Sequence, residues 1–119
     1  MKQLAMVLTA VSALSGSAAA GERFYCNMNA LSKAERAHHQ ELSQALFKAA
    51  VEKAELANGY GFRLAAKDLA VAAEWVGLES RCCPFFELEL RQARDQGPLW
   101  LRVTGSEGVK AFIRAEFGL

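Results

Sequence analysis

The sequence predicts a small α+β domain in which a three-stranded, mainly antiparallel sheet is covered on one face by helices. Three segments alternate apolar and polar residues, three others carry apolar residues at helical spacing, and turn residues separate them. The 119 residues are 52% hydrophobic and 23% charged, which excludes a disordered chain. The expected order of elements is α-β-α-β-β-α within one domain.

Residues 1–20 match a secretory signal peptide. Lys2 precedes an uncharged stretch, and Ala18-Ala19-Ala20 precedes Gly21 as a small-residue cleavage site. The stretch is too short and too rich in Ser and Thr for a stable membrane span. We therefore expect residues 21–119 to form the mature domain, in the periplasm or secreted, with no membrane span after cleavage. That chain has 13 basic and 13 acidic residues, and it contains no charge block typical of a nucleic-acid-binding arm.

A long first helix is expected to begin at a capping box. Ser32 and Glu35 have the S-x-x-E spacing in which each side chain caps a free backbone amide. Asn58-Gly59 provides a stop signal, so the expected helix extends to that pair. At about 100° per residue, the apolar arc of this helix comprises Leu42, Leu46, Ala50, Ala54 and Ala57.

The remaining elements follow from alternation and from breakers. Residues 60–64 alternate and predict a strand, whereas Asp68 can cap a helix from Leu69 to Cys82 that Pro84 must end. Residues 86–91 and 99–103 alternate on either side of a turn, which predicts a β-hairpin. Residues 109–117 supply a final amphipathic helix.

The most informative stretch is Glu79-Ser80-Arg81-Cys82-Cys83-Pro84-Phe85, at the end of the second helix. Glu79 precedes the two cysteines by three and four residues, a spacing that brings side chains together on a helix. Arg81 is adjacent, and a nearby cation favours the thiolate, which is the form that acts as nucleophile and as metal ligand. This stretch is therefore the candidate functional site.

Three interpretations of the cysteines stay open. In the first, Cys26 forms a stapling disulfide with Cys82 or Cys83, because adjacent cysteines do not easily bridge each other, and the domain is structural or binds a partner. In the second, the exported protein binds a soft metal ion through the vicinal pair, helped by Cys26. In the third, Cys82 or Cys83 is the attacking sulfur of a redox protein or an enzyme, although no C-x-x-C motif is present.

The metal interpretation is the leading one, and it favours a binding protein over an enzyme. Its ligands would be Cys26, Cys82 and Cys83, with Glu79 or His39 as a further donor. His39 is chosen because it falls on the inward arc of the first helix, about 100° from its neighbour His38. Soft thiolates suit copper(I) and zinc, and by the same softness mercury(II) and trivalent arsenic.

Four motifs together resemble a family of small uncharacterised bacterial proteins with an E-x-x-C-C-P-F stretch. They are Glu79-x-x-Cys82-Cys83-Pro84-Phe85-Phe86, Asn58-Gly59-Tyr60-x-Phe62-Arg63, Gly97-Pro98-Leu99-Trp100-Leu101 and Thr104-Gly105-x-x-Gly108-Val109-Lys110. The resemblance spans most of the expected mature chain, and the leader looks like an addition to it. The resemblance implies that this chain shares the fold of that family and that the four motifs belong together. No activity is established for the family.

Overall fold

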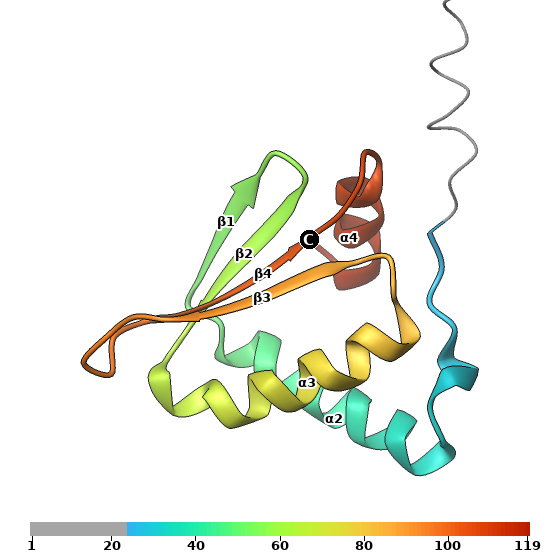
Figure 1. Ribbon diagram of the computed structural model, residues 1–119, viewed down its shortest axis with the longest axis horizontal. Helices are drawn as coiled ribbons and strands as arrows, with labels where there is room; N and C mark the ends of the chain where they lie inside the picture. The colour runs from blue at the N-terminus through green and yellow to red at the C-terminus, as the bar shows by residue number, and fades with distance from the viewer. Residues whose placement is uncertain (1–23) are drawn as a thin grey trace, which may run out of the picture.

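The computed structural model describes residues 24–119, which form two layers (Figure 1). One layer is a four-stranded antiparallel sheet with the strand order β1-β2-β4-β3. Within these residues, α2, α3 and α4 pack against a single face of the sheet. The α+β class and the placement of the helices are therefore confirmed. The predicted leader, residues 1–20, lies outside the described residues.

Helix α2 (Lys33–Ala49) begins as predicted and ends early. Its N-cap Ser32 accepts a hydrogen bond from the Glu35 amide, and the Glu35 carboxylate accepts one from the Ser32 amide, at 3.1 and 2.8 Å. The expected continuation to Asn58 is wrong. The Val51 amide instead donates to the carbonyl oxygen of Arg63 at 2.9 Å, which starts strand pairing two residues after the helix ends.

The sheet has one more strand than predicted. Strands β1 (Glu52–Leu56) and β2 (Gly59–Leu64) form a hairpin, so the element order is α-β-β-α-β-β-α. Asn58-Gly59 therefore lies at the hairpin turn. Gly59 is required there, because a Cβ at this position would clash with the carbonyl oxygen of Val103 in β4.

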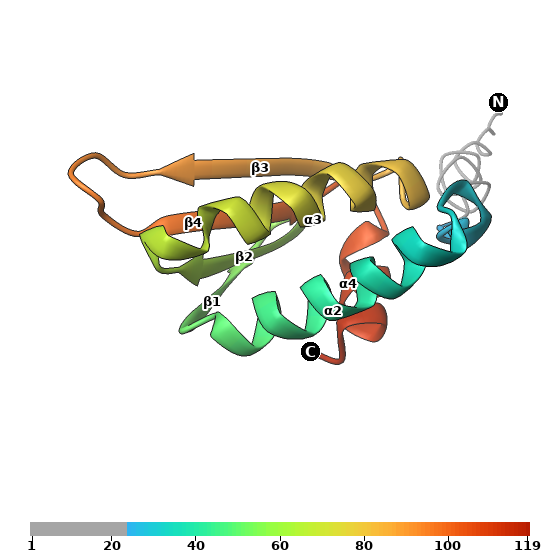
Figure 2. The ribbon, with the colours of Figure 1, turned by 90° about the horizontal axis from the view of Figure 1, so that it is seen from below.

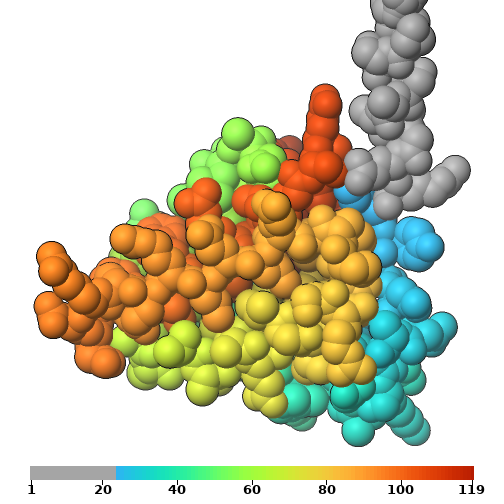
Figure 3. Space-filling model, in the orientation of Figure 1, coloured from blue at the N-terminus to red at the C-terminus, as the bar shows by residue number. Residues whose placement is uncertain are grey.

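The second half of the chain follows the prediction closely. After a 3-10 turn (Ala66–Asp68), α3 (Leu69–Cys82) leads into the antiparallel hairpin of β3 (Glu87–Gln92) and β4 (Leu99–Thr104). Helix α4 (Val109–Phe117) closes the chain. The hairpin loop extends beyond the helices at the left of Figure 3.

Helices α2 and α3 run side by side in opposite directions beneath the sheet (Figure 2). A buried stripe on α3 consists of Ala72, Trp75, Glu79 and Cys82. The segment before α2, which includes a 3-10 turn (Met28–Ala30), passes the C-terminal end of α3, where the Asn27 amide donates to the Cys82 carbonyl oxygen at 2.7 Å. This arrangement brings Cys26, in the segment before α2, next to Cys82 and Cys83 at the C-terminal end of α3. Among residues 24–119, no helix is long and apolar enough to span a membrane.

Candidate thiol and metal centre

Cys26 forms a disulfide with Cys83, which is 57 residues further along the chain. Their Cα atoms are 4.5 Å apart, within the usual range of about 4.4–6.8 Å. The hydrogen bond from Asn27 to Cys82 holds the N-terminal segment against the end of α3. The sequence left the choice between Cys82 and Cys83 open, and the structure assigns the bond to Cys83.

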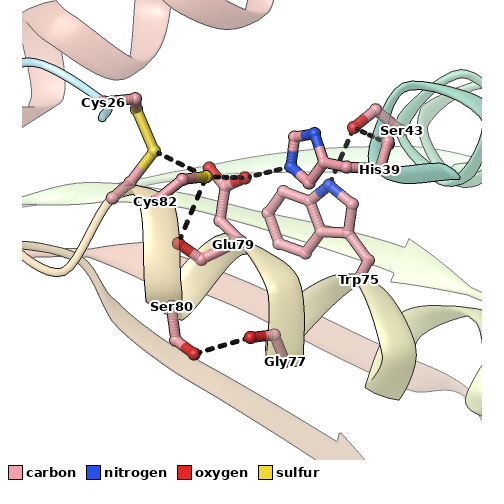
Figure 4. Close-up of polar contacts among 9 residues, drawn as sticks. Cys26, His39, Ser43, Trp75, Gly77, Glu79, Ser80 and Cys82 are labelled. Carbon is pink, nitrogen blue, oxygen red and sulfur yellow. Dashed lines mark hydrogen bonds and ion pairs between the residues drawn. A yellow bond between two sulfur atoms is a disulfide. The ribbon is translucent and has the colours of Figure 1, made fainter. Parts of the chain in front are cut away.

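Cys82 is the free cysteine among the described residues, and its side chain is buried. Its Sγ atom lies 3.6 Å from Sγ of Cys83 and 3.9 Å from Oε1 of Glu79. The three sulfur atoms therefore form one cluster at the C-terminal end of α3 (Figure 4). A carboxylate lies directly beside it, as the helical spacing of Glu79 and Cys82 predicts.

Glu79 is a buried acidic side chain, and His39 is its partner. Nε2 of His39 lies 2.6 Å from Oε1 of Glu79, and the two side chains are 15% and 4% exposed. The imidazole stacks on Trp75, whose indole nitrogen donates to Ser43 on α2. The inward placement of His39 is confirmed, whereas His38 pairs with Glu74 at 2.8 Å on the surface.

The cluster opens into a cavity of about 310 Å³ between α2, α3 and α4. Three aromatic side chains, Phe47, Trp75 and Phe117, line it as an aromatic wall, together with Met28, Ser43, Gln44 and Glu116. This aromatic wall was not predicted from the sequence. One available signal was the four-residue spacing of His39, Ser43 and Phe47, which places them on one face of α2. The contribution of Phe117 depends on how α4 packs, which periodicity does not reveal.

Burial raises the pKa of the Cys82 thiol to about 11, and the negative charge of Glu79 acts in the same direction. Arg81 lowers this pKa only slightly, because its guanidinium pairs with Glu35 at 2.9 Å. The sequence-based expectation that Arg81 favours a thiolate is therefore outweighed by desolvation and by Glu79. Cys82 is a protonated thiol at neutral pH.

Alkylation of Cys82 should therefore accelerate with pH well beyond the ordinary thiol pKa of 9.0, towards a plateau near 11. Replacing Glu79 by Gln removes the charge that opposes ionisation, so E79Q should shift the plateau to lower pH. The measurement is the rate of iodoacetamide labelling of the disulfide-bonded protein as a function of pH. E74Q on the exposed side of α3 is the matched control and should leave the profile unchanged. A wild-type plateau near pH 9 would contradict the assignment.

All of the sequence-predicted ligands meet at this centre. Cys26, Cys83 and Glu79 form one group of potential donors, and Cys82, His39 and Glu79 form another, with the ligand atoms of each group within 4.8 Å of one another. Glu79 belongs to both groups and joins them. These Cys, His and Glu side chains are close enough to hold a metal ion. The disulfide currently ties up two of the sulfurs, since a metal ligand must be a thiolate.

No protein family, curated protein or solved structure matches this chain. The resemblance drawn from the E-x-x-C-C-P-F stretch therefore stays a prediction.

Proposed function

We propose that the protein, once an external dithiol has reduced its Cys26–Cys83 disulfide and has itself been oxidised to a disulfide, binds one soft metal ion of the copper, zinc, mercury or arsenic type. The observation that carries this proposal is the convergence of Cys26, Cys82 and Cys83 on a cluster that also contains Glu79 and His39. Reduction frees two thiols beside the thiol of Cys82, so three thiols then lie next to the carboxylate of Glu79 and the imidazole of His39. A single ion held by these groups is the function that the geometry supports best.

The spacing of the sulfurs suits a shared ion. With metal–sulfur bonds of about 2.3 Å and tetrahedral angles, two thiolates on one zinc ion lie about 3.8 Å apart. The Sγ atoms of Cys82 and Cys83 are 3.6 Å apart, so they need little movement to share a metal. Softness favours sulfur-seeking ions over magnesium or calcium, which prefer oxygen ligands.

Glu79 and His39 supply the rest of the proposed centre. The carboxylate contacts both the thiol of Cys82 and the imidazole of His39, so it can serve as the fourth ligand while His39 orients it. Such outer partners of metal ligands commonly change metal affinity by about 10- to 100-fold. Because the thiol of Cys82 is protonated at neutral pH, metal binding releases its proton, and the affinity should rise with pH.

The same structure bears on the two other interpretations, a stapling disulfide and an attacking cysteine. The Cys26–Cys83 bond staples the N-terminal segment to α3, so a structural role of the oxidised form coexists with metal binding by the reduced form. A role for Cys82 as attacking sulfur is disfavoured, because the raised pKa leaves little thiolate at neutral pH. We place the protein in the periplasm or outside the cell, a location supported by the disulfide and by the leader-like residues 1–20.

The proposal predicts that reduced protein takes up one equivalent of Zn²⁺ and that C82S lowers the affinity at least about 100-fold. The measurement is titration against a chromogenic chelator without oxygen, with near-UV circular dichroism of Trp75 and Trp100 as the folding check. Oxidised wild-type protein is the matched control and should bind weakly, because it has one free thiol. Equal affinities of the reduced and oxidised forms would refute the proposal.

A further inference from the structure

The cavity at the thiol centre is larger than a bare ion needs. A coordinated ion occupies little more space than its ligand shell, whereas about 310 Å³ approaches the lower end of sites for small organic ligands, about 300–1,000 Å³. Besides the thiol centre, the cavity is lined by Phe47, Trp75 and Phe117, whose rings offer no metal ligand. Met28, Ser43, Gln44 and Glu116 complete the lining. The aromatic wall therefore indicates that part of the ligand is organic.

The oxidised protein also differs from the reduced one in the number of thiols at this site. With Cys26 and Cys83 joined, Cys82 is the remaining thiol of the described cluster. One thiolate satisfies a metal that has a single open valence, such as a mercury(II) ion that already carries one carbon substituent. A bare ion needs several thiolates and is poorly served by this form.

We propose that the disulfide-bonded protein binds a soft metal cation carrying one organic group, with the metal on Cys82 and the organic group against the wall of Phe47, Trp75 and Phe117. This inference rests on the proposed function and specifies a ligand class for its oxidised form. The disulfide then selects the ligand: bare ions for the reduced protein, mono-organic cations for the oxidised protein.

The binding step is a ligand exchange without change of oxidation state. For an arylmercury(II) acetate, the S–H bond of Cys82 breaks, a sulfur–mercury bond forms and acetate leaves with the electrons of its bond to mercury. The proton goes first to the carboxylate of Glu79, whose Oε1 is 3.9 Å from the sulfur and 2.6 Å from Nε2 of His39. The mercury–carbon bond stays intact.

The aromatic wall is suited to a flat substituent. The ring centroids of Phe47 lie 5.4 Å from those of Trp75 and 5.0 Å from those of Phe117, both in edge-to-face arrangements. Aromatic pairs at about 4.5–7 Å gain stability beyond their buried area. An aryl group should therefore bind better than a methyl group on the same metal.

The test compares phenylmercury and methylmercury acetate on oxidised protein, each in competition with glutathione, which cancels the intrinsic strength of the sulfur–mercury bond. Native mass spectrometry should show one equivalent on wild type and none on C82S. We expect phenylmercury to be preferred by about tenfold after this normalisation. F117L should reduce the preference several-fold, whereas F85L, the same change outside the cavity, should preserve it.

The outcomes separate this inference from the metal proposal. Equal normalised affinities for the phenyl and methyl compounds, or a preference that survives F117L, would overturn the organic-ligand assignment. Uptake by C82S would overturn the assignment of the metal to Cys82. None of these results changes the expected Zn²⁺ binding by reduced protein, which is measured separately.

Discussion

Reduction of the Cys26–Cys83 disulfide should lower the free energy of unfolding by about 4 kcal/mol. The bond closes a loop across 57 residues, and opening it restores conformational freedom to the unfolded chain. The folded state also loses the clamp that holds Phe24 against Phe85 and Phe112. In a domain of this size, each kcal/mol corresponds to about 4–8 °C in melting temperature.

Urea unfolding with and without reductant measures this effect. C26S should match reduced wild type and should not respond to reductant, because it lacks the disulfide. C82S is the control, because it keeps the disulfide and should lose as much stability on reduction as wild type does. A loss below about 1 kcal/mol on reduction would contradict the stapling role.

The same instability connects folding to metal binding. A ligand that binds only the folded state stabilises it by about 2.7 kcal/mol at a free concentration 100 times its dissociation constant. Zn²⁺ should therefore recover much of the stability that reduction removes, provided that the three cysteines converge in the folded state. The oxidised protein should show little stabilisation by Zn²⁺.

Replacing His39 by Ala should destabilise the protein by about 3 kcal/mol. Glu79 is buried beneath α2, and H39A removes the partner that its carboxylate contacts at 2.6 Å. A buried carboxylate that has lost its hydrogen-bonding partner is strongly destabilising, because its desolvation is no longer compensated.

The neighbouring pair provides a matched control. His38 contacts Glu74 at 2.8 Å, but both side chains are about half exposed, so H38A should change stability by less than about 1 kcal/mol. Chemical denaturation of H39A, H38A and the double variant H39A/E79Q measures the difference. Equal free energies of unfolding for H39A and H38A would show that the buried pair of His39 and Glu79 stabilises the protein no more than the exposed pair does.

The parts of the fold that the sequence predicts correctly are those whose signals are local. The Ser32 and Glu35 capping box, the alternation in β4 and the amphipathic pattern of α4 each depend on a few adjacent residues. Strand β1 was missed because Lys53 and Glu55, which pair with Phe62 and Tyr60, are exposed charged residues where an apolar alternation would be expected. Glu55 is instead satisfied by Lys110 of α4 at 2.7 Å, a contact that no local pattern contains.

In the site too, features set by local helical geometry were predictable, whereas those set by tertiary packing were not. The approach of Glu79 to Cys82 and the inward position of His39 follow from helical geometry, and both were predictable. The pairing of Cys26 with Cys83 depends on where the N-terminal segment passes the end of α3. That path is set by tertiary packing, as is the aromatic wall shared by α2, α3 and α4.

X-ray absorption at the zinc edge, on reduced protein loaded with one equivalent of Zn²⁺, shows directly whether Cys26, Cys82 and Cys83 bind one ion. We expect three sulfur neighbours at about 2.3 Å and one nitrogen or oxygen at about 2.0–2.2 Å. C82S should lose one of those sulfurs. A first shell made only of nitrogen and oxygen atoms would contradict the proposed metal centre, because the ion would then be bound away from Cys26, Cys82 and Cys83.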